Sequence, residues 1–217
     1  KNDAGYYQDD VLVYPPTAGI SNRVTASRTW IVDPAAVPVR LNEVLASNRR
    51  GFAYYGTTPD AVELYNYGAA AVALGGLRLT DDPAAPDKFT FPAGATIGAG
   101  EYLVLLANNS DGTPGYHLGF NLNRQGQTLY LYDAAGRGGR LLDSVAFGLQ
   151  VTDYSIGRRA DGQWALNLPS LGSANLEQQL AGVGSLKINE WLATGGVAYY
   201  ADWVELYNPQ GLPVALG

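Results

Sequence analysis

The chain has 217 residues and a formal net charge of −6, so its long-range field repels phosphate backbones and anionic lipid surfaces. It contains no cysteine, which excludes a disulfide framework and thiolate metal sites. Apolar residues make up 47% of it, and 27 glycines, 12 prolines and 15 tyrosines favour short strands joined by turns. We therefore expect an all-β protein with a packed core and no nucleic-acid partner. No stretch approaches the roughly 20 apolar residues that cross a bilayer, so no transmembrane segment is expected.

Residues 1–36 are expected to hold the C-terminal strands of a preceding β domain plus a linker. The apolar run at 11–14 and the β-branched run at 24–32 are typical of strands, and Pro34 and Pro38 follow as breakers. An alternative is an N-terminal extension that adds strands to the domain that follows.

From residue 37 the pattern changes to short strands at regular spacing, separated by turn residues such as Asp161 and Gly162. The predicted strands are 39–46, 61–66, 72–80, 88–91, 101–107, 117–120, 128–132, 141–147, 154–157 and 164–166. No apolar 3.6-residue period lasts long enough for a core helix, although 176–180 could form one helical turn. This pattern predicts a β-sandwich or a barrel.

An internal repeat links the two ends of this region. Four blocks recur in order: LNEVLA at 41–46 returns as INEWLA at 188–193, AYY at 53–55 as AYY at 198–200, VELYN at 62–66 as VELYN at 204–208, and VALG at 72–75 as VALG at 214–217. A repeat this long indicates tandem domains. Residues 181–217 are therefore expected to be a linker and the truncated start of a second copy.

Two or three strands cannot bury their own apolar face, so this second copy needs a partner or stays disordered. We expect residues 187–217 to pack against a sheet of this chain or of another copy. Intermolecular strand pairing through the same residues is one form of this packing.

The repeated blocks belong to a larger set of motifs. They are LNEV at 41–44, VELYN at 62–66, LTDD at 79–82, FP at 91–92 with GEYLV at 100–104, and SIGR at 155–158 with Trp164. Together they resemble the bacterial lamin tail domain, over roughly residues 39–176. The match ends with Pro169, Gly172 and Asn175, close to the closing Pro-Gly-x-x-Asn of that family.

The resemblance implies an immunoglobulin-like β-sandwich, which we place at residues 37–180. Bacterial members of the family occur in exported modular proteins, and the family has no established catalytic residues. Its nuclear members contact DNA and chromatin proteins, but the acidic charge of this chain opposes the DNA contact.

Asp81, Asp82 and Asp87 place three carboxylates in one loop, which suits a hard cation such as calcium. The loop lacks the alternating spacing and the late bidentate Glu of a dedicated calcium loop. Aspartates also begin turns by accepting bonds from their own backbone. We favour a structural turn over a calcium site.

Glu43 and Glu63, in two of the repeated strands, invite comparison with the paired carboxylates of a glycosidase. Strand alternation predicts that Glu43 shares a face with Leu41 and Leu45, as a partly buried acid in need of a partner. We favour this structural role, with Arg158 or Arg159 as the partner.

The Tyr54–Tyr55 pair is a candidate platform for sugar rings, as are the pairs at 6–7 and 199–200, although cross-strand packing is the more ordinary use of tyrosine. His117 is the only histidine, so a multi-histidine metal site is excluded.

These observations predict a non-enzymatic interaction or spacer module of an exported bacterial multidomain protein, located outside the cell, in the periplasm or at the cell surface. Its partners would be neighbouring domains of the same polypeptide, surface proteins or glycans, with no cofactor. A carbohydrate- or calcium-dependent binding module is the alternative. A hydrolase accessory domain with its own carboxylate site is third.

Overall fold

The computed structural model describes residues 6–10, 27–31, 37–110, 112–193 and 202–216, in two units, Lys1–Pro38 and Val39–Gly217. In the first unit, β1 (Tyr6–Asp10) pairs antiparallel with β2 (Ser27–Ile31). The strand expected at 11–14 lies outside the described residues. The origin of this unit in a preceding domain stays a prediction.

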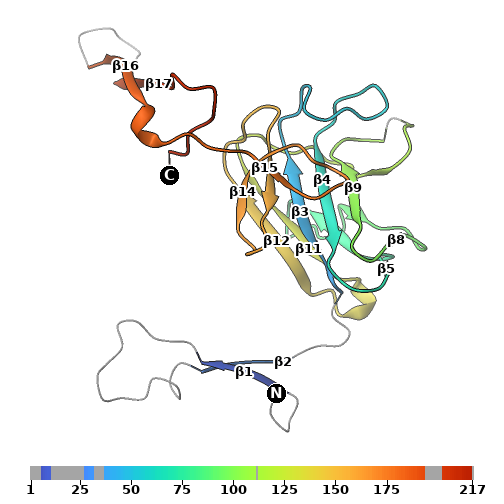
Figure 1. Ribbon diagram of the computed structural model, residues 1–217. Coiled ribbons are helices and arrows are strands. Elements are labelled where there is room, and N and C mark those ends of the chain that lie inside the picture. The colour runs from blue at the N-terminus through green and yellow to red at the C-terminus, as the bar shows by residue number, and fades with distance from the viewer. Residues whose placement is uncertain (1–5, 11–26, 32–36, 111, 194–201, 217) are drawn as a thin grey trace, which may run out of the picture. The chain divides into compact units, whose positions relative to one another are not determined.

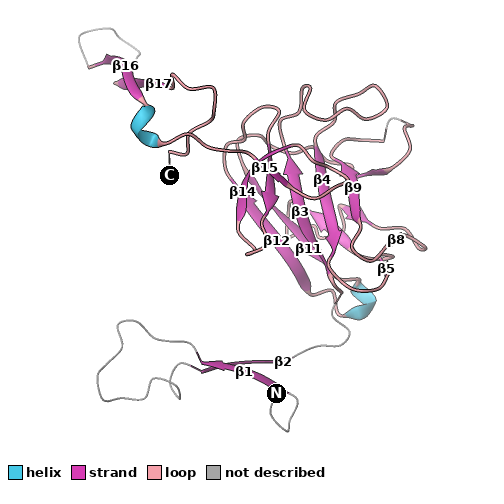
Figure 2. Ribbon diagram, viewed as in Figure 1, coloured by secondary structure: helices cyan, strands magenta, loops and turns pink. Residues whose placement is uncertain are grey.

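The second unit contains a seven-stranded sheet and a four-stranded sheet (Figures 1 and 2). The seven-stranded sheet has the order β10 (Tyr116–His117), β9 (Tyr102–Leu106), β4 (Ala61–Asn66), β3 (Val39–Leu45), β13 (Ser155–Arg158), β14 (Trp164–Leu168) and β15 (Leu176–Glu177). The four-stranded sheet has the order β12 (Leu141–Phe147), β11 (Gln127–Tyr132), β6 (Arg78–Thr80) and β7 (Phe89–Thr90). Two further short strands, β5 (Val72–Ala73) and β8 (Thr96–Ile97), pair antiparallel with each other as a separate small sheet.

The two sheets share one apolar core. Leu41 and Leu64 of the seven-stranded sheet and Leu129 and Leu131 of the four-stranded sheet are all fully buried. Along β11, Leu129 and Leu131 alternate with partly exposed tyrosines, as expected for a strand with one buried face. The prediction of an all-β sandwich is confirmed.

Two local predictions are wrong. The strand expected at 72–80 is two short strands, because Gly76 adopts a left-handed φ of 83° and Leu77 N bonds to Leu74 O at 2.8 Å in a turn. The segment 176–180, which could have formed one helical turn, instead contains β15, which pairs antiparallel with β14. The open edge of β14 offers backbone groups that a helical turn would leave unused. The described residues also include two 3-10 turns, η1 (Ala135–Arg137) and η2 (Val183–Ser185), and no described helix is long and apolar enough to span a membrane.

β16 (Lys187–Leu192) and β17 (Trp203–Tyr207) form an antiparallel hairpin. Their residues are almost all exposed, so the expected packing of this segment against a sheet of the same chain is not found for these two strands. Within the same C-terminal segment, Ala181 N donates to Pro213 O at 2.8 Å. Residues 194–201, including the tyrosine pair at 199–200, lie outside the described residues.

Candidate functional site

Glu43 and Glu63 lie directly opposite each other on β3 and β4, and both side chains are fully buried. The pairing register skips from Leu41 to Glu43, so Asn42 is the extra residue of a β-bulge. The bulge turns Leu41 toward the core and Glu43 toward the opposite, outer face of the sheet. The prediction that Glu43 shares a face with Leu41 is therefore wrong, because an inserted residue inverts the alternation.

Glu43 is bound by serines, and the predicted partners Arg158 and Arg159 lie elsewhere. Ser155 Oγ donates to Glu43 Oε1 at 2.5 Å. Ser170 donates twice, from its backbone N to Oε1 at 2.9 Å and from Oγ to Oε2 at 2.8 Å. Hydroxyl and backbone donors thus satisfy this buried carboxyl without a cation.

Glu63 is held by an amide and a backbone donor. Asn42 Nδ2 donates to Glu63 Oε1 at 2.8 Å, and Gly172 N donates to Oε2. Burial raises the pKa of Glu63 to about 7; the two hydrogen bonds oppose this rise, and the neighbouring Glu43 adds to it. Ser170 and Gly172 belong to one segment, so both acids serve to fasten it onto the sheet.

Asn175 completes the closure of this segment. Its Nδ2 donates to Asn42 O at 3.1 Å and to Arg158 O at 2.9 Å, and its Oδ1 accepts from Asn42 Nδ2 at 2.9 Å. A Cβ at Gly157 would collide with the amides of Asn167 and Asn175, so glycine is needed there for close approach.

Arg158 ties the two sheets together. Its Nη2 lies 2.6 Å from Asp143 Oδ2 on β12, and its Nε donates to Leu41 O at 3.0 Å. Asp143 Oδ2 also accepts a hydrogen bond from Leu41 N at 2.9 Å. This bond satisfies the backbone N–H of the residue that precedes the bulge. The guanidinium stacks on Trp164 at 4.8 Å from the ring centre.

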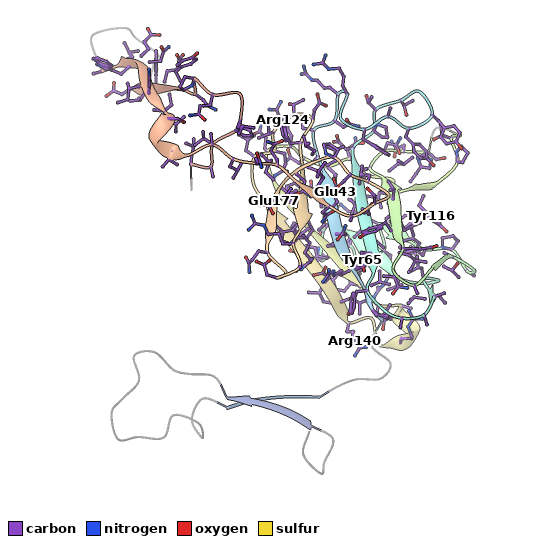
Figure 3. All side chains as sticks on the ribbon, in the orientation of Figure 1. Glu43, Tyr65, Tyr116, Arg124, Arg140 and Glu177 are labelled. Carbon is purple, nitrogen blue, oxygen red and sulfur yellow. The ribbon has the colours of Figure 1, made fainter. Side chains whose placement is uncertain are left out.

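A groove of about 610 Å³ opens on the same outer face, next to the closing segment. It is lined by Arg40, Asn42, Tyr65, Tyr102, Gly157, Arg158, Arg159, Ala160, Asp161, Asn167, Ala174, Asn175 and Glu177. In Figure 3, Glu43 and Tyr65 are labelled on the neighbouring strands β3 and β4, and Glu177 is labelled on β15 at the sheet edge. No local motif of the sequence indicates this groove, because its lining comes from six separate segments of the chain.

Aromatic and cationic side chains form one end of the groove. Tyr65 and Tyr102 stack with ring centres 4.8 Å apart, and the guanidinium of Arg40 lies 5.5 Å from the ring centres of both Tyr65 and Tyr67. The ring of Tyr65 is therefore occupied by Tyr102 and Arg40. A ligand in this groove would therefore meet polar groups more than open ring faces.

Two of these polar groups have no partner. Arg40 Nε and Asn167 Nδ2 are buried atoms without a hydrogen bond to any described residue. Both are donors, and a buried donor without an acceptor costs about 1–3 kcal/mol. The groove therefore suits a ligand group that accepts hydrogen bonds, such as a carboxylate.

The proposed sugar platform at Tyr54 and Tyr55 is not flat. The ring centres lie 4.9 Å apart with an angle of 59° between the rings. Tyr54 Oη donates to Pro114 O at 2.8 Å, which fixes that ring against a neighbouring loop. Tyr55 is 69% exposed and has a left-handed φ of 46°, which is rare for a residue with a side chain.

The three aspartates proposed for calcium point to separate partners. Asp81 Oδ1 pairs with Lys88 Nζ at 2.7 Å, and Asp87 Oδ1 pairs with Arg78 Nη1 at 2.9 Å. Asp82 Oδ1 accepts from Ala84 N at 2.9 Å, as in an ordinary aspartate turn. Across the described part of the chain, no group of three His, Cys, Asp or Glu side chains is arranged to hold a metal ion.

Two further polar residues organise loops. His117 Nδ1 lies 2.7 Å from Asn108 Oδ1, and its Nε2 lies 3.1 Å from Thr113 O. Asp153 Oδ1 accepts from the backbone N–H groups of residues 49, 50 and 51 at 2.6 to 3.1 Å, and these bonds lower its pKa. No local pattern in the sequence indicates this role of Asp153, since its partners lie more than 100 residues away.

The structure is thus an all-β sandwich with open sheets, and the segment that binds Glu43 and Glu63 lies over the outer face of the seven-stranded sheet. The family model of the Lamin Tail Domain matches residues 33–148. The chain belongs to this family. The matched range contains both buried glutamates, while Ser155, Ser170 and Gly172, which donate hydrogen bonds to them, follow it in the sequence. No curated protein matches the chain.

Proposed function

We propose that the chain is a non-catalytic interaction module of an exported bacterial multidomain protein, and that its outer-face groove docks an acidic segment of a neighbouring domain or surface protein. The observation that carries this proposal is the pair of buried donors without acceptors, Arg40 Nε and Asn167 Nδ2, in one groove. A carboxylate would satisfy both kinds of donor and would gain a charge-assisted bond from Arg40.

The buried acids support the non-catalytic part of the proposal. Glu43 and Glu63 are fully buried, and all four of their oxygens accept hydrogen bonds from the protein. A glycosidase needs its carboxyls to reach a sugar and a water molecule. These two acids instead accept hydrogen bonds from the closing segment, from Ser155 and from Asn42.

The exported and bacterial parts rest on the sequence resemblance. The motifs quoted above resemble bacterial lamin tail domains, which occur in exported modular proteins. A composition without cysteine is compatible with that setting, as it is with others.

An array of acidic, neutral and basic peptides, probed with the whole chain, tests the proposal. We expect binding to acidic peptides, and a loss of at least about tenfold in Arg40→Gln, since removing one charged hydrogen bond costs about 1.5–3 kcal/mol. Arg124→Gln removes the same charge at an exposed site outside the groove and should bind like the wild type. Equal binding by the wild type and Arg40→Gln would overturn the assignment of the groove.

Carbohydrate binding is the second candidate, because Tyr55 is an exposed aromatic residue held in a strained backbone conformation. A glycan array probed with the wild type and Tyr55→Ala tests it. Binding that disappears in Tyr55→Ala and persists in Arg40→Gln would favour this candidate. Repeating the array with calcium and with a chelator tests calcium dependence.

A further inference from the structure

The hairpin β16–β17 repeats the geometry of β3–β4, including its irregularity. In β3–β4, Leu41 pairs with Leu64 and Glu43 with Glu63, so Asn42 bulges. In β16–β17, Ile188 pairs with Leu206 and Glu190 with Glu205, so Asn189 bulges at the equivalent place. The two glutamates of the hairpin therefore also face each other.

The same side-chain hydrogen bonds hold both hairpins. Asn42 Nδ2 donates to Glu63, and Asn189 Nδ2 donates to Glu205. At the end of the second strand, Asn66 Nδ2 donates to Ala70 O at 2.8 Å, and Asn208 Nδ2 donates to Leu212 O at 2.8 Å. The hairpin thus has the local structure of a lamin tail domain's first two strands.

The burial of the two hairpins is opposite. The core-facing residues Leu41, Val44, Val62 and Leu64 are each 0% exposed. Their equivalents by register are Ile188 at 65%, Trp191 at 68%, Val204 at 60% and Leu206 at 49% exposed. Four large apolar side chains on one face of two strands are an interaction surface.

The first hairpin shows what covers such a face. Leu41 and Val44 are buried under the four-stranded sheet. The inward residues of that sheet are at most 3% exposed; they are Leu79, Leu129, Leu131 and Val145. Across residues 37–110, 112–193 and 202–216, no second sheet of this kind is present to cover β16–β17.

We propose that β16–β17 is a docking hairpin, and that its apolar face receives a lamin-tail four-stranded sheet that lacks a first hairpin of its own. The partner's chemistry follows from the first module. It presents alternating leucine and valine residues like those of β6, β11 and β12, and a closing segment with serine hydroxyl and backbone N–H donors. These donors would hydrogen-bond to the carboxylates of Glu190 and Glu205, as Ser170 and Gly172 do to those of Glu43 and Glu63.

Extending the full chain tests this docking directly. Residues 76–180 of the first module are appended after Gly217, since residues 72–75 and 214–217 have the same sequence. Hydrogen exchange of peptides covering 187–192 and 203–207 is then compared in the extended and original chains. We expect exchange in both strands to slow at least about 100-fold in the extended chain, because they enter a cooperative core.

Two variants of the extended chain make the result specific. Ile188→Asp places a charge on the proposed docking face and should restore fast exchange, while Gln210→Asp, in the exposed turn after β17, should not. Unchanged exchange in the extended chain would overturn the proposal. So would self-association of the original chain that Ile188→Asp abolishes in sedimentation experiments, because a second copy of the hairpin would then be the occupant.

Discussion

Glu63 is an acid held where its charge is costly. It is fully buried and lies opposite Glu43 on the adjacent strand. Its pKa rises to about 7 from an ordinary value of 4.5. Between these two pH values the folded chain holds a proton that the unfolded chain has released. Stability from this group is thus fully present below pH 4.5 and is lost as the pH rises toward and through 7.

Glu63→Gln should remove this pH dependence. Each pH unit between the two pKa values corresponds to about 1.4 kcal/mol, so the wild type should lose at most about 3 kcal/mol relative to Glu63→Gln between pH 4.5 and pH 7.5. Urea unfolding of both proteins across this pH range measures the difference. Glu101→Gln, at an exposed carboxyl, should follow the wild type. A constant difference between the wild type and Glu63→Gln at all pH values would contradict the prediction.

At the scale of elements, residues 169–175 act as a latch on the outer face of the sheet. Ser170 binds Glu43 of β3, Gly172 binds Glu63 of β4, and Asn175 binds the backbone of Asn42 and Arg158. This short segment therefore joins β3, β4 and β13. It also forms one wall of the groove through Ala174 and Asn175.

Asn175→Ala should open this latch. The substitution removes two donated hydrogen bonds and leaves the buried amide of Asn42 without one acceptor, so a loss of about 2–3 kcal/mol in the free energy of unfolding is expected. Chemical denaturation measures it. Ser173→Ala, in the same segment but exposed, should change stability by less than about 0.5 kcal/mol. Equal effects of the two substitutions would show that Asn175 does not hold the latch.

At the scale of the whole molecule, the sandwich has its own core and the hairpin β16–β17 has none. The core of the sandwich draws on both sheets, and the Asp143–Arg158 ion pair links them at one edge. Two strands with an exposed apolar face are marginal in water. The chain thus combines a module that has its own core with a hairpin whose apolar residues are exposed.

Hydrogen exchange of the unmodified chain should separate these two regions. Amides of β3 and β4 should exchange only through global unfolding, whereas those of β16 and β17 should exchange at close to the rate of an unfolded chain. Both hairpins have nearly the same sequence and register, so each is a control for the other. Matching protection in the two hairpins would show that β16–β17 is already covered.

The sequence by itself determined the class of fold, most of the strands and the recurrence of the first hairpin. These features are local, because strand alternation, turn residues and repeated blocks can all be read along the chain. The strand at 61–66 was predicted to the residue for the same reason, since the polar and apolar residues of β4 are bounded by clear turns.

Only the tertiary structure decided how the candidate residues are used. One bulged residue, Asn42, moved Glu43 to the outer face, and a segment more than 100 residues away supplied the donors that bind it. The tertiary structure also pairs Arg158 with Asp143 in an ion pair. It leaves the Nε of Arg40, in the groove, without a hydrogen-bond acceptor. These outcomes depend on contacts between distant segments, which residue types and spacing do not specify.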